Sequence, residues 1–373
     1  MLTAIDLFAG AGGFSEGFRM EGFHILAAND LDKNAADTYK QNHPEVQFLD
    51  GPIQDIDGQD LLKVTGIKKE ELDVLIGGPP CQAFSVYNHQ RGFHDERSGL
   101  FREYIRIVEA LKPKIIVMEN VTGMSSVEKG RAIIEIHKAL EQLGYTAEHK
   151  ILKAEDYGVP QERRRIIFFG VRDNFSIQWP EPTHDKDGYK KLKKFNTVWD
   201  AISDLPALNI DEGFEEGEHI NEPLSDLQKY LRKRIRHIFN HYAPHLAPIN
   251  IQRMRFIPQG GSWRDIPQDL LPNGMKRANR SDHTKRYGRL MQNGLSSTIL
   301  TRCDPHWGAY IHPTQDRTLT VREAARLQTF PDRIKFSGSR VEQYRQVGNA
   351  VPPLLGKAIA KSVRNILTIG NLK

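Results

Sequence analysis

The sequence feature that most constrains the fold is the alternation of short apolar runs with amphipathic stretches over the first 170 residues. The apolar runs lie at 3–8, 23–28, 72–77, 114–118 and 165–171. Between them, apolar side chains recur at helical spacing, for example at Tyr104, Ile107 and Leu111. Because apolar strands that alternate with helices are typical of a mostly parallel sheet covered on both faces, we predict a doubly wound, Rossmann-like α/β fold.

This alternation stops near residue 174, which suggests a domain boundary. Residues 175–316 show Pro and Gly at irregular intervals and little periodicity, apart from a basic helix predicted around 227–239. Regular order returns with a helix predicted at 321–328 and a last helix whose apolar face carries Leu355, Ile359, Val363, Ile366 and Leu367. We expect a first domain over 1–175, a smaller irregular domain over 176–316, and a segment over 317–373 that returns to the first domain.

The composition excludes several classes of protein. No apolar run approaches the roughly 18 residues that a membrane span needs. The chain opens directly on an apolar strand pattern, without the basic region and cleavage site of a signal peptide. Its two cysteines, Cys81 and Cys303, cannot form a four-thiolate zinc site or a disulfide framework. We therefore expect a cytoplasmic protein without a membrane segment or a bound metal.

The net charge of +5 is unevenly distributed. Residues 1–174 carry 21 basic and 27 acidic side chains, whereas residues 229–289 carry 14 basic and three acidic ones. A local excess of this size would attract a polyphosphate partner. A solvated basic helix explains the same charge run, so the charge alone leaves both interpretations open.

The first candidate site is the glycine-rich turn that follows the first apolar run, from Phe8 to Gly13. Glycines let a ligand approach the backbone closely, and the following helix offers free N–H groups. Asp30, about twenty residues on, is well placed for a ribose hydroxyl. A nicotinamide dehydrogenase or a merely structural turn would look similar, but Ser15 stands where the third glycine of the dinucleotide fingerprint belongs.

Two further candidates follow later apolar strands. Cys81 lies on the Gly- and Pro-rich loop that begins at Gly77, and Glu119 directly follows the strand at 114–118. Because the first, fourth and fifth strands of a doubly wound sheet are neighbours, Gly10, Cys81 and Glu119 should meet in one crevice. Taken singly, the cysteine could be a small buried hydrophobe and the glutamate a helix cap.

A fourth candidate is the basic run that leads into the strand at 165–171. Strand alternation would send Arg163 and Arg165 to one face and Arg164 to the other. Two guanidinium groups on one face suit an anionic substrate or a phosphate, and they would favour a nearby thiolate. An exposed basic strand edge remains the alternative for Arg164.

Together these motifs resemble the C5-cytosine DNA methyltransferase family, in particular its bacterial and phage modification enzymes. The matching segments follow the family's order and cover nearly the whole chain. They are 8–13 (the S-adenosylmethionine loop), 79–82 (the nucleophile motif), 119–121, Gln161-x-Arg163-x-Arg165, 322–331 and 346–352. The resemblance implies a doubly wound methyltransferase sheet, and it implies that 176–316 is the target recognition domain.

The resemblance also implies which residues bind each ligand. It assigns S-adenosylmethionine to Phe8, Ala9, Gly10, Gly12, Gly13, Asp30, Leu31, Ile53, Pro79, Asn349, Ala350 and Val351. It assigns double-stranded DNA to Gln82, Ser85, Thr298 and Arg302. One departure is Pro52, which stands where the family carries an adenine-contacting acid, so Asp50 or a backbone group would have to replace that contact. A monomer with a separate cognate restriction endonuclease, located in the cytoplasm and on the nucleoid when bound to DNA, completes the expectation.

The implied reaction is methylation of cytosine at C5. The Cys81 thiolate would add to C6 of a cytosine flipped out of the duplex, and Glu119 would hold N3 and the N4 amino group. Arg163 or Arg165 would lower the pKa of the thiol. C5 then takes the methyl group of S-adenosylmethionine, a solvent-derived base removes the C5 proton, and Cys81 leaves.

Two alternatives use the same fold. A similar family methylates cytosine in tRNA, but its typical Cys-Phe-Thr segment is absent here. A catalytically inactive DNA-binding scaffold would normally lack the Pro-Cys or Glu-Asn-Val residues, and both are present. A nicotinamide oxidoreductase explains only the first glycine loop. Cys303 has no predicted role.

Overall fold

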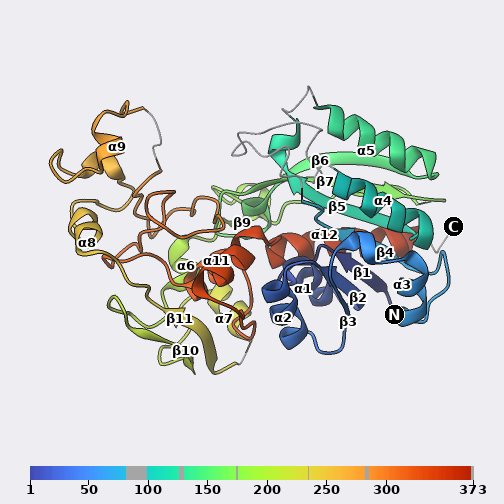
Figure 1. Cartoon of the computed structure of the whole chain (residues 1–373), viewed down its shortest axis with the longest axis horizontal. Coiled ribbons are helices and arrows are strands. Elements are labelled where there is room, and N and C mark those ends of the chain that lie inside the picture. The colour runs from blue at the N-terminus through green and yellow to red at the C-terminus, as the bar shows by residue number, and fades with distance from the viewer. Residues whose placement is uncertain (81–98, 126–129, 174, 234, 282–284, 371–373) are drawn as a thin grey trace. The chain divides into compact units, whose positions relative to one another are not determined.

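The computed structural model describes residues 1–80, 99–125, 130–173, 175–233, 235–281 and 285–370 (Figure 1). By its contacts the chain divides into two compact units. Unit 1 comprises Met1–Tyr157, Arg164–Pro182 and Ala350–Lys373, and unit 2 comprises Gly158–Arg163 and Thr183–Asn349. Residues 317–349 group with unit 2 and Ala350–Lys373 with unit 1, whereas the sequence analysis expected the whole segment 317–373 to return to the first domain.

Unit 1 contains a seven-stranded sheet in the order β3-β2-β1-β4-β5-β7-β6. The strands are β1 (Thr3–Leu7), β2 (His24–Asp30), β3 (Gln47–Asp50), β4 (Val74–Gly77), β5 (Ile115–Val121), β6 (Thr146–Lys153) and β7 (Arg164–Val171). Strands β1 to β5 pair in parallel, and β7 pairs antiparallel with both β5 and β6. The mostly parallel sheet confirms the predicted fold class, and the adjacency of β1, β4 and β5 is as expected.

The five strands predicted from apolar runs are all present, but two further strands of this sheet were missed. These are β3 and β6, which form the two edges of the sheet. Their residues are largely exposed or half-buried, so they lack the continuous apolar run of a central strand.

The helices of unit 1 cover both faces of this sheet (Figure 1). They are α1 (Gly13–Met20), α2 (Lys33–Asn42), α3 (Gly58–Thr65), α4 (Leu100–Leu111), α5 (Arg131–Gln142) and α12 (Pro353–Gly370), with short 3-10 turns η1 (Ile53–Asp55), η4 (Thr122–Ser125) and η6 (Ala154–Tyr157). Helix α4 packs between α3 and α5, and α1 packs against α12. All five apolar residues predicted for the inner face of the last helix are buried.

Helices α1 and α12 meet backbone to backbone. A Cβ added to Gly17 would lie 2.6 Å from both the carbonyl carbon of Gly356 and the amide nitrogen of Lys357. Both helices therefore approach more closely than any larger residue at position 17 would allow. This contact joins the end of the chain to the helix that follows the glycine-rich turn.

Unit 2 is less regular. Its strands are β8 (His184–Asp185), β9 (Lys193–Lys194), β10 (Gly213–Glu218) and β11 (His237–Tyr242). Its helices are α6 (Val198–Ile202), α7 (Asp226–Arg232), α8 (Pro248–Met254), α9 (Asn273–Lys276), α10 (Val321–Leu327) and α11 (Arg340–Asn349), with η7 (Tyr189–Lys191) and η8 (Trp263–Asp265). The helix predicted at 321–328 is confirmed as α10.

The long basic helix predicted at 227–239 was wrong in its second half. Helix α7 ends at Arg232, and Lys233 has a left-handed φ of 39°. The chain then enters β11, which pairs antiparallel with the acidic strand β10. A run of basic residues does not distinguish a helix from a strand, and the acidic pairing partner is more than ten residues upstream.

Unit 2 contains a set of buried and paired charges that we call the buried-charge frame. Its members are Asp204, Arg317, Arg322, Glu323, Arg326 and Asp332, all at most 1% exposed. Arg317 donates to both carboxylate oxygens of Glu323 at 2.8 and 2.7 Å, and Arg326 pairs with Asp332 at 2.5 and 2.6 Å. Burial alone would raise the pKa of Glu323, but the charge and hydrogen bonds of Arg317 hold that pKa well below its usual range. Paired in this way, the charges are stable away from water.

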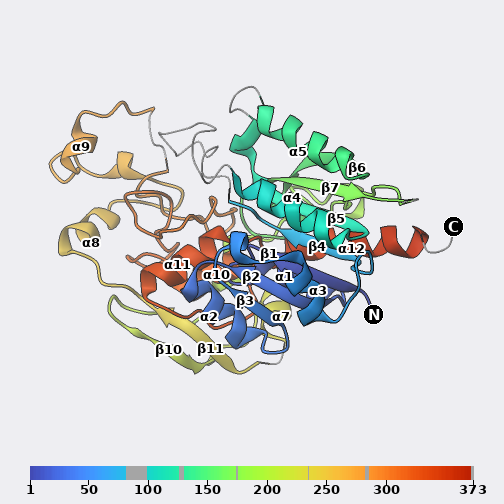
Figure 2. The same cartoon turned by 45° about the vertical axis from the view of Figure 1, so that its right-hand side comes forward.

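A separate apolar cluster lies within the same unit. Its buried members are Met254, Ile257, Trp263, Ile266, Leu271, Met275, Tyr287 and Ile311, and we call it the 254–311 cluster. Helices α8 and α9 contribute to it, and they lie apart from the β10–β11 pair (Figure 2). No helix among the described residues is long and apolar enough to cross a membrane.

Candidate active site

The carboxyl ends of β1, β4 and β5 lie side by side in unit 1, as the sequence predicts. The turn after β1 has left-handed backbone at Phe8 (φ 58°), Gly10 (φ 54°) and Gly12 (φ 82°). A Cβ on Gly12 would approach the His43 ring to 3.0 Å, whereas no described atom lies within 4 Å of a Cβ position on Gly10. The turn thus requires glycine at 12 for close packing, and it leaves its backbone open at Gly10 for a ligand.

Asp30 closes the other side of this turn. Its Oδ2 accepts a hydrogen bond from the Gly10 amide at 2.7 Å, and its Oδ1 accepts one from the Asp32 amide at 2.8 Å. Burial raises the pKa of Asp30 above its usual value. Each carboxylate oxygen keeps a second lone pair, so the group retains capacity to accept from a ribose hydroxyl. Next to it, Leu31 is 70% exposed and offers an apolar surface to a planar ring.

Asp6 stabilises the end of the glycine-rich turn through hydrogen bonds to Ser15, a role that the sequence analysis missed. Its Oδ2 accepts from the Ser15 hydroxyl at 2.6 Å and from the Ser15 amide at 3.2 Å, and Ser15 Oγ also shares a hydrogen bond with Tyr39 Oη at 2.8 Å. Ser15 therefore anchors the first turn of α1 where a dinucleotide fingerprint has a glycine. Burial raises the pKa of Asp6 to about 7.

The loop after β3 carries the departure noted at Pro52. Asp50 pairs with Lys40 at 2.8 Å, and the Ile53 side chain is buried in the core of unit 1. Asn29 Nδ2 donates to the carbonyl oxygens of Leu49 and Gly51, both at 2.9 Å. The loop is therefore fixed from β2 by an amide that the sequence analysis did not single out.

Glu119 and Arg165 form an ion pair on adjacent strands. Arg165 Nε lies 2.6 Å from Glu119 Oε1, and Glu119 is 8% exposed. A Cβ on Gly78 would lie 3.2 Å from the other oxygen, Oε2, so glycine at 78 keeps that oxygen uncrowded. Asn120 Nδ2 donates to the Pro79 carbonyl at 2.9 Å and fixes the start of the cysteine loop. Cys81, Gln82 and Ser85 lie outside the described residues.

Arg163 has a different setting from Arg165. Strand β7 begins at Arg164, so the alternation expected from the sequence does not apply to Arg163, which belongs to unit 2. Its guanidinium is fully buried and donates to the carbonyl oxygens of Ile299 at 3.2 Å and Gly348 at 2.9 Å. Through these two hydrogen bonds Arg163 links the backbone at Ile299 to the backbone at Gly348 within unit 2.

Gln161 works beside Arg163. Its Oε1 accepts from the Ile299 amide at 3.0 Å, and its Nε2 donates to Gln328 Oε1 at 3.2 Å. The Thr298 hydroxyl donates to the Glu162 carbonyl at 2.6 Å. Segment 296–299 is thus held against 158–163, and the half-buried Thr298 hydroxyl, which donates to Glu162, keeps its capacity to accept a hydrogen bond.

The remaining predicted residues take simple positions. Arg302 and Asn349 are exposed in unit 2, and Ala350 and Val351 begin the last segment of unit 1. Among the described parts of the chain, no three His, Cys, Asp or Glu residues gather as metal ligands would.

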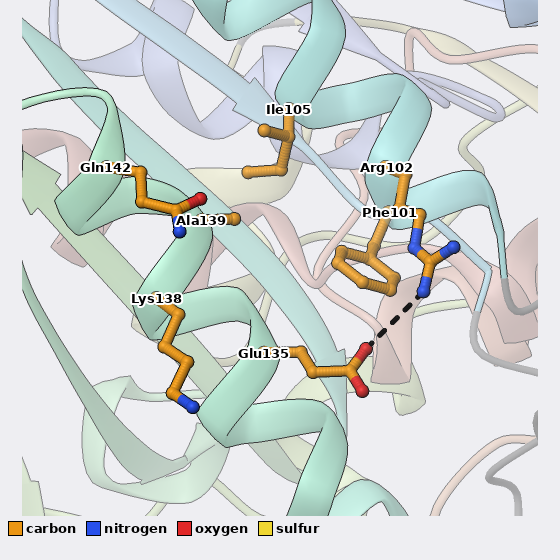
Figure 3. A pocket seen from close by; sticks show the side chains of 7 residues that line it. All are labelled: Phe101, Arg102, Ile105, Glu135, Lys138, Ala139 and Gln142. Atoms are coloured by element: carbon orange, nitrogen blue, oxygen red, sulfur yellow. Dashed lines mark ion pairs between the residues drawn. The ribbon is translucent and has the colours of Figure 1, made fainter.

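A surface hollow of about 290 Å³ lies away from these residues, between α4 and α5 (Figure 3). It is lined by Phe101, Arg102, Ile105, Glu135, Lys138, Ala139 and Gln142. Arg102 and Glu135 pair across it at 3.7 Å. None of the predicted site residues lines it.

The model of the C-5 cytosine-specific DNA methylase family matches residues 2–365. The chain belongs to this family. It is 38% identical over 371 residues to Type II methyltransferase M1.HphI of Haemophilus parahaemolyticus, covering 98% of this chain and 88% of that protein. It is 33% identical over 427 residues to Type II methyltransferase M.AgeI of Thalassovita gelatinovora, covering 97% and 99%.

Solved structures agree with the fold of this methylase. Spodoptera frugiperda DNMT2 aligns with a TM-score of 0.61 at 17% identity, covering 98% of this chain and 100% of the other. Schizosaccharomyces pombe Dnmt2 aligns with a TM-score of 0.57 at 18% identity, covering all of both chains. At these identities the likeness concerns the fold alone.

The family membership establishes the reaction class. The protein is a DNA cytosine-5 methyltransferase, and its methyl donor is S-adenosylmethionine. The turn at 8–13, the Asp30 carboxylate and the exposed Leu31 fit that donor, because they offer backbone amides, a hydroxyl acceptor and an apolar surface at one sheet edge.

Proposed function

We propose that this methylase modifies a short specific sequence in double-stranded DNA, with Cys81 as the nucleophile and Glu119 as the group that holds the target cytosine. The observation that carries the proposal is the Glu119–Arg165 pair beside Gly78. Arg165 occupies one carboxylate oxygen, and the small residue at 78 leaves the other available for the cytosine N3 or N4 group.

The chemistry follows from the reactivity of cytosine. C5 is a poor nucleophile until a thiolate adds to C6, and this addition places electron density on C5 and N3. Glu119 stabilises that charge by sharing a proton with N3, and Arg165 stabilises the carboxylate. When bound, S-adenosylmethionine supplies the methyl group to C5. A solvent-derived base then removes the C5 proton, and the C6–sulfur bond breaks to regenerate Cys81.

Arg165, rather than Arg163, is the guanidinium that acts on the reacting groups. Arg165 contacts Glu119 directly, whereas the Arg163 guanidinium donates to carbonyl groups of unit 2. We assign Arg163 a positioning role, in which it holds the segment around Ile299 and the end of α11.

The turn at residues 8–13, which follows β1, holds the methyl donor through its backbone. The Asp30 carboxylate accepts a hydrogen bond from the ribose of the donor. The further residues of this site are Leu31, Ile53, Pro79, Asn349, Ala350 and Val351. Ile53 acts through its backbone, because its side chain is buried in the core. Pro52 and the Lys40-paired Asp50 leave the adenine without a dedicated acid from this loop.

The DNA is bound by Gln82 and Ser85 near the nucleophile and by Thr298 and Arg302 in unit 2. A base inside a duplex cannot reach Cys81, so the target cytosine flips out at a cost of a few kcal/mol. Unit 2 reads the surrounding bases. The type II relatives support a role in restriction-modification beside a separately acting endonuclease. We propose a monomeric enzyme that acts in the cytoplasm.

The test is methylation of unmethylated genomic DNA with S-adenosylmethionine, followed by bisulfite sequencing. We expect methylation confined to one short motif with wild-type protein and with Cys303→Ser, and none with Cys81→Ser. Glu119→Gln should reduce transfer by at least a hundredfold while donor binding is retained. If folded, donor-binding wild-type protein methylates tRNA and leaves every duplex unmodified, the proposed substrate is wrong.

A further inference from the structure

Like Tyr189 (68% exposed) and Phe256 (47% exposed), Trp307 is an exposed aromatic side chain of unit 2. Trp307 is 58% exposed, whereas Tyr310, three residues further along the chain, and Trp263 and Tyr287 of the 254–311 cluster are buried. A single exposed aromatic residue is common on protein surfaces and has no meaning by itself. The reason to consider Trp307 is the rigid and basic setting in which it is held.

The loop that carries Trp307 is fixed by hydrogen bonds. Asp304 Oδ1 accepts from the His306 amide and lies 2.8 Å from His306 Nδ1, and the Asp304 carbonyl accepts from the Trp307 amide at 3.0 Å. His306 Nε2 lies 2.7 Å from Tyr287 Oη, and the Tyr287 amide donates to the Pro305 carbonyl at 2.6 Å. The loop is therefore tied at several points to a residue of the 254–311 cluster.

Such a loop presents its indole without needing to order on binding. Interfaces gain affinity when a contact residue is already held in place, because less conformational entropy is lost. Tyr287 itself has a left-handed φ of 50°, a strained backbone that occurs where surrounding structure imposes it. The exposed indole is thus a consequence of an anchored loop and not of a loose one.

The charge around Trp307 suits a nucleic acid. The Arg286 guanidinium lies 5.9 Å from the centre of the indole ring, within range of a cation–π contact. Arg286 lies in the stretch 229–289, with its 14 basic and three acidic residues, and Arg302 on the other side of Asp304 is exposed. Aromatic side chains interleaved with arginines are the combination that proteins use to stack on bases and to contact phosphates.

We infer that Trp307 is a DNA-contacting residue of this methylase, whose indole stacks on a nucleobase of the substrate while Arg286 beside it contacts the phosphate backbone. The inference rests on the proposed DNA substrate. It concerns binding and sequence preference and assigns Trp307 no part in methyl transfer itself.

The test compares DNA binding of Trp307→Ala, Trp307→Phe and Arg286→Gln with wild type, on a labelled duplex that contains the motif found by bisulfite sequencing. Ile220→Ala is the matched control, because Ile220 is a 77% exposed apolar residue of unit 2 outside the basic stretch. Base stacking is lost on substitution with alanine at a cost equivalent to roughly 5- to 150-fold in affinity. We therefore expect about tenfold or more weaker binding for Trp307→Ala and near wild-type binding for Trp307→Phe and Ile220→Ala.

Salt dependence separates the two contacts. Loss of a phosphate contact lowers the slope of log Kd against log salt by about one, whereas loss of a stacking contact leaves it unchanged. Arg286→Gln should therefore reduce the slope and Trp307→Ala should not. In steady-state assays, Trp307→Ala should raise KM for DNA and leave KM for S-adenosylmethionine unchanged.

Two results would overturn the inference. One is DNA binding by Trp307→Ala equal to that of Ile220→Ala. The other is a loss that Trp307→Phe shares in full. Because Trp307 is one of four tryptophans, DNA-induced quenching of tryptophan fluorescence gives an independent readout that Trp307→Phe should largely remove. If wild-type enzyme methylates DNA and these variants do not differ from it, the inference fails alone. If wild-type enzyme does not act on DNA, the proposed function fails first.

Discussion

The contact between α1 and α12 allows one substitution to be worked through from distances. In Gly17→Ala the new Cβ would lie 2.6 Å from two backbone atoms of α12, about 1 Å inside ordinary carbon contact. Neither backbone atom can rotate away, so the two helices must separate. Overpacking of this kind costs about 1–3 kcal/mol or more, and alanine recovers up to about 1 kcal/mol of helix propensity. Because neither backbone can give way, we take the upper end of the overpacking cost, about 3 kcal/mol, and expect a net loss of roughly 2 kcal/mol after the gain in helix propensity.

The measurement is urea unfolding of Gly17→Ala beside wild type and Gly274→Ala. Gly274 lies in α9, and no described atom lies within 4 Å of a Cβ there, so alanine at 274 should be neutral or slightly stabilising. Because α1 begins directly after the glycine-rich turn, Gly17→Ala should also weaken binding of S-adenosylmethionine in calorimetry. An unchanged urea midpoint together with unchanged donor affinity would refute the close contact between these helices.

Three further predictions concern buried groups. Burial raises the pKa of Asp6 from 3.8 to about 7, so the native protein keeps a proton that the unfolded chain releases, and the free energy of unfolding should fall as pH rises from about 4 to 7. Urea titrations at pH 5 and pH 8 should show a smaller fall for Asp6→Asn, and an equal fall would contradict this assignment. Burial also raises the pKa of the Cys303 thiol, so Cys303→Ser should leave methylation largely intact, and a large loss of transfer in folded protein would argue against Cys81 as the only nucleophile. Arg326→Met leaves Asp204 and Asp332 without their shared partner and should destabilise the protein by about 3–5 kcal/mol in thermal unfolding. The control, Lys229→Met at an exposed position, should have little effect, and similar melting temperatures of the two variants would contradict the buried-charge frame.

The central strands and the last helix are predicted well from the sequence, because their buried positions carry apolar residues in continuous runs or at helical spacing. Strands β1, β4 and β5 are apolar runs, and their adjacency follows from the general topology of such sheets. The edge strands β3 and β6 are not predicted, because one or both of their faces are exposed to solvent and they therefore lack a continuous apolar run. For the segment 227–239, local charge was a poor guide, since the acidic strand β10 decides that its second half is extended.

The candidate site shows a similar division. The motif positions of Glu119 and Arg165 are visible in the sequence, but the ion pair between them depends on the antiparallel register of β5 and β7. Arg163 looks like its neighbours in sequence, yet its hydrogen-bond partners Ile299 and Gly348 are 136 and 185 residues away. No local pattern distinguishes such a buried arginine from an exposed one.

The two kinds of core in unit 2 have a consequence for how new specificities arise. The buried-charge frame draws on residue 204 and residues 317–332, whereas the 254–311 cluster draws on the stretch between them. No residue belongs to both, and further ion-pair partners of the frame, among them His219 and Arg232, also lie outside 254–311. Recombination that replaces residues 254–311 as a whole leaves the pairs of the frame in place, provided that the arginine at 289, which pairs with Asp316, is kept. Under the proposed function, an exchange of residues 254–311 supplies a different reading surface in a single event, whereas stepwise change within the frame passes through intermediates with unpaired buried charges.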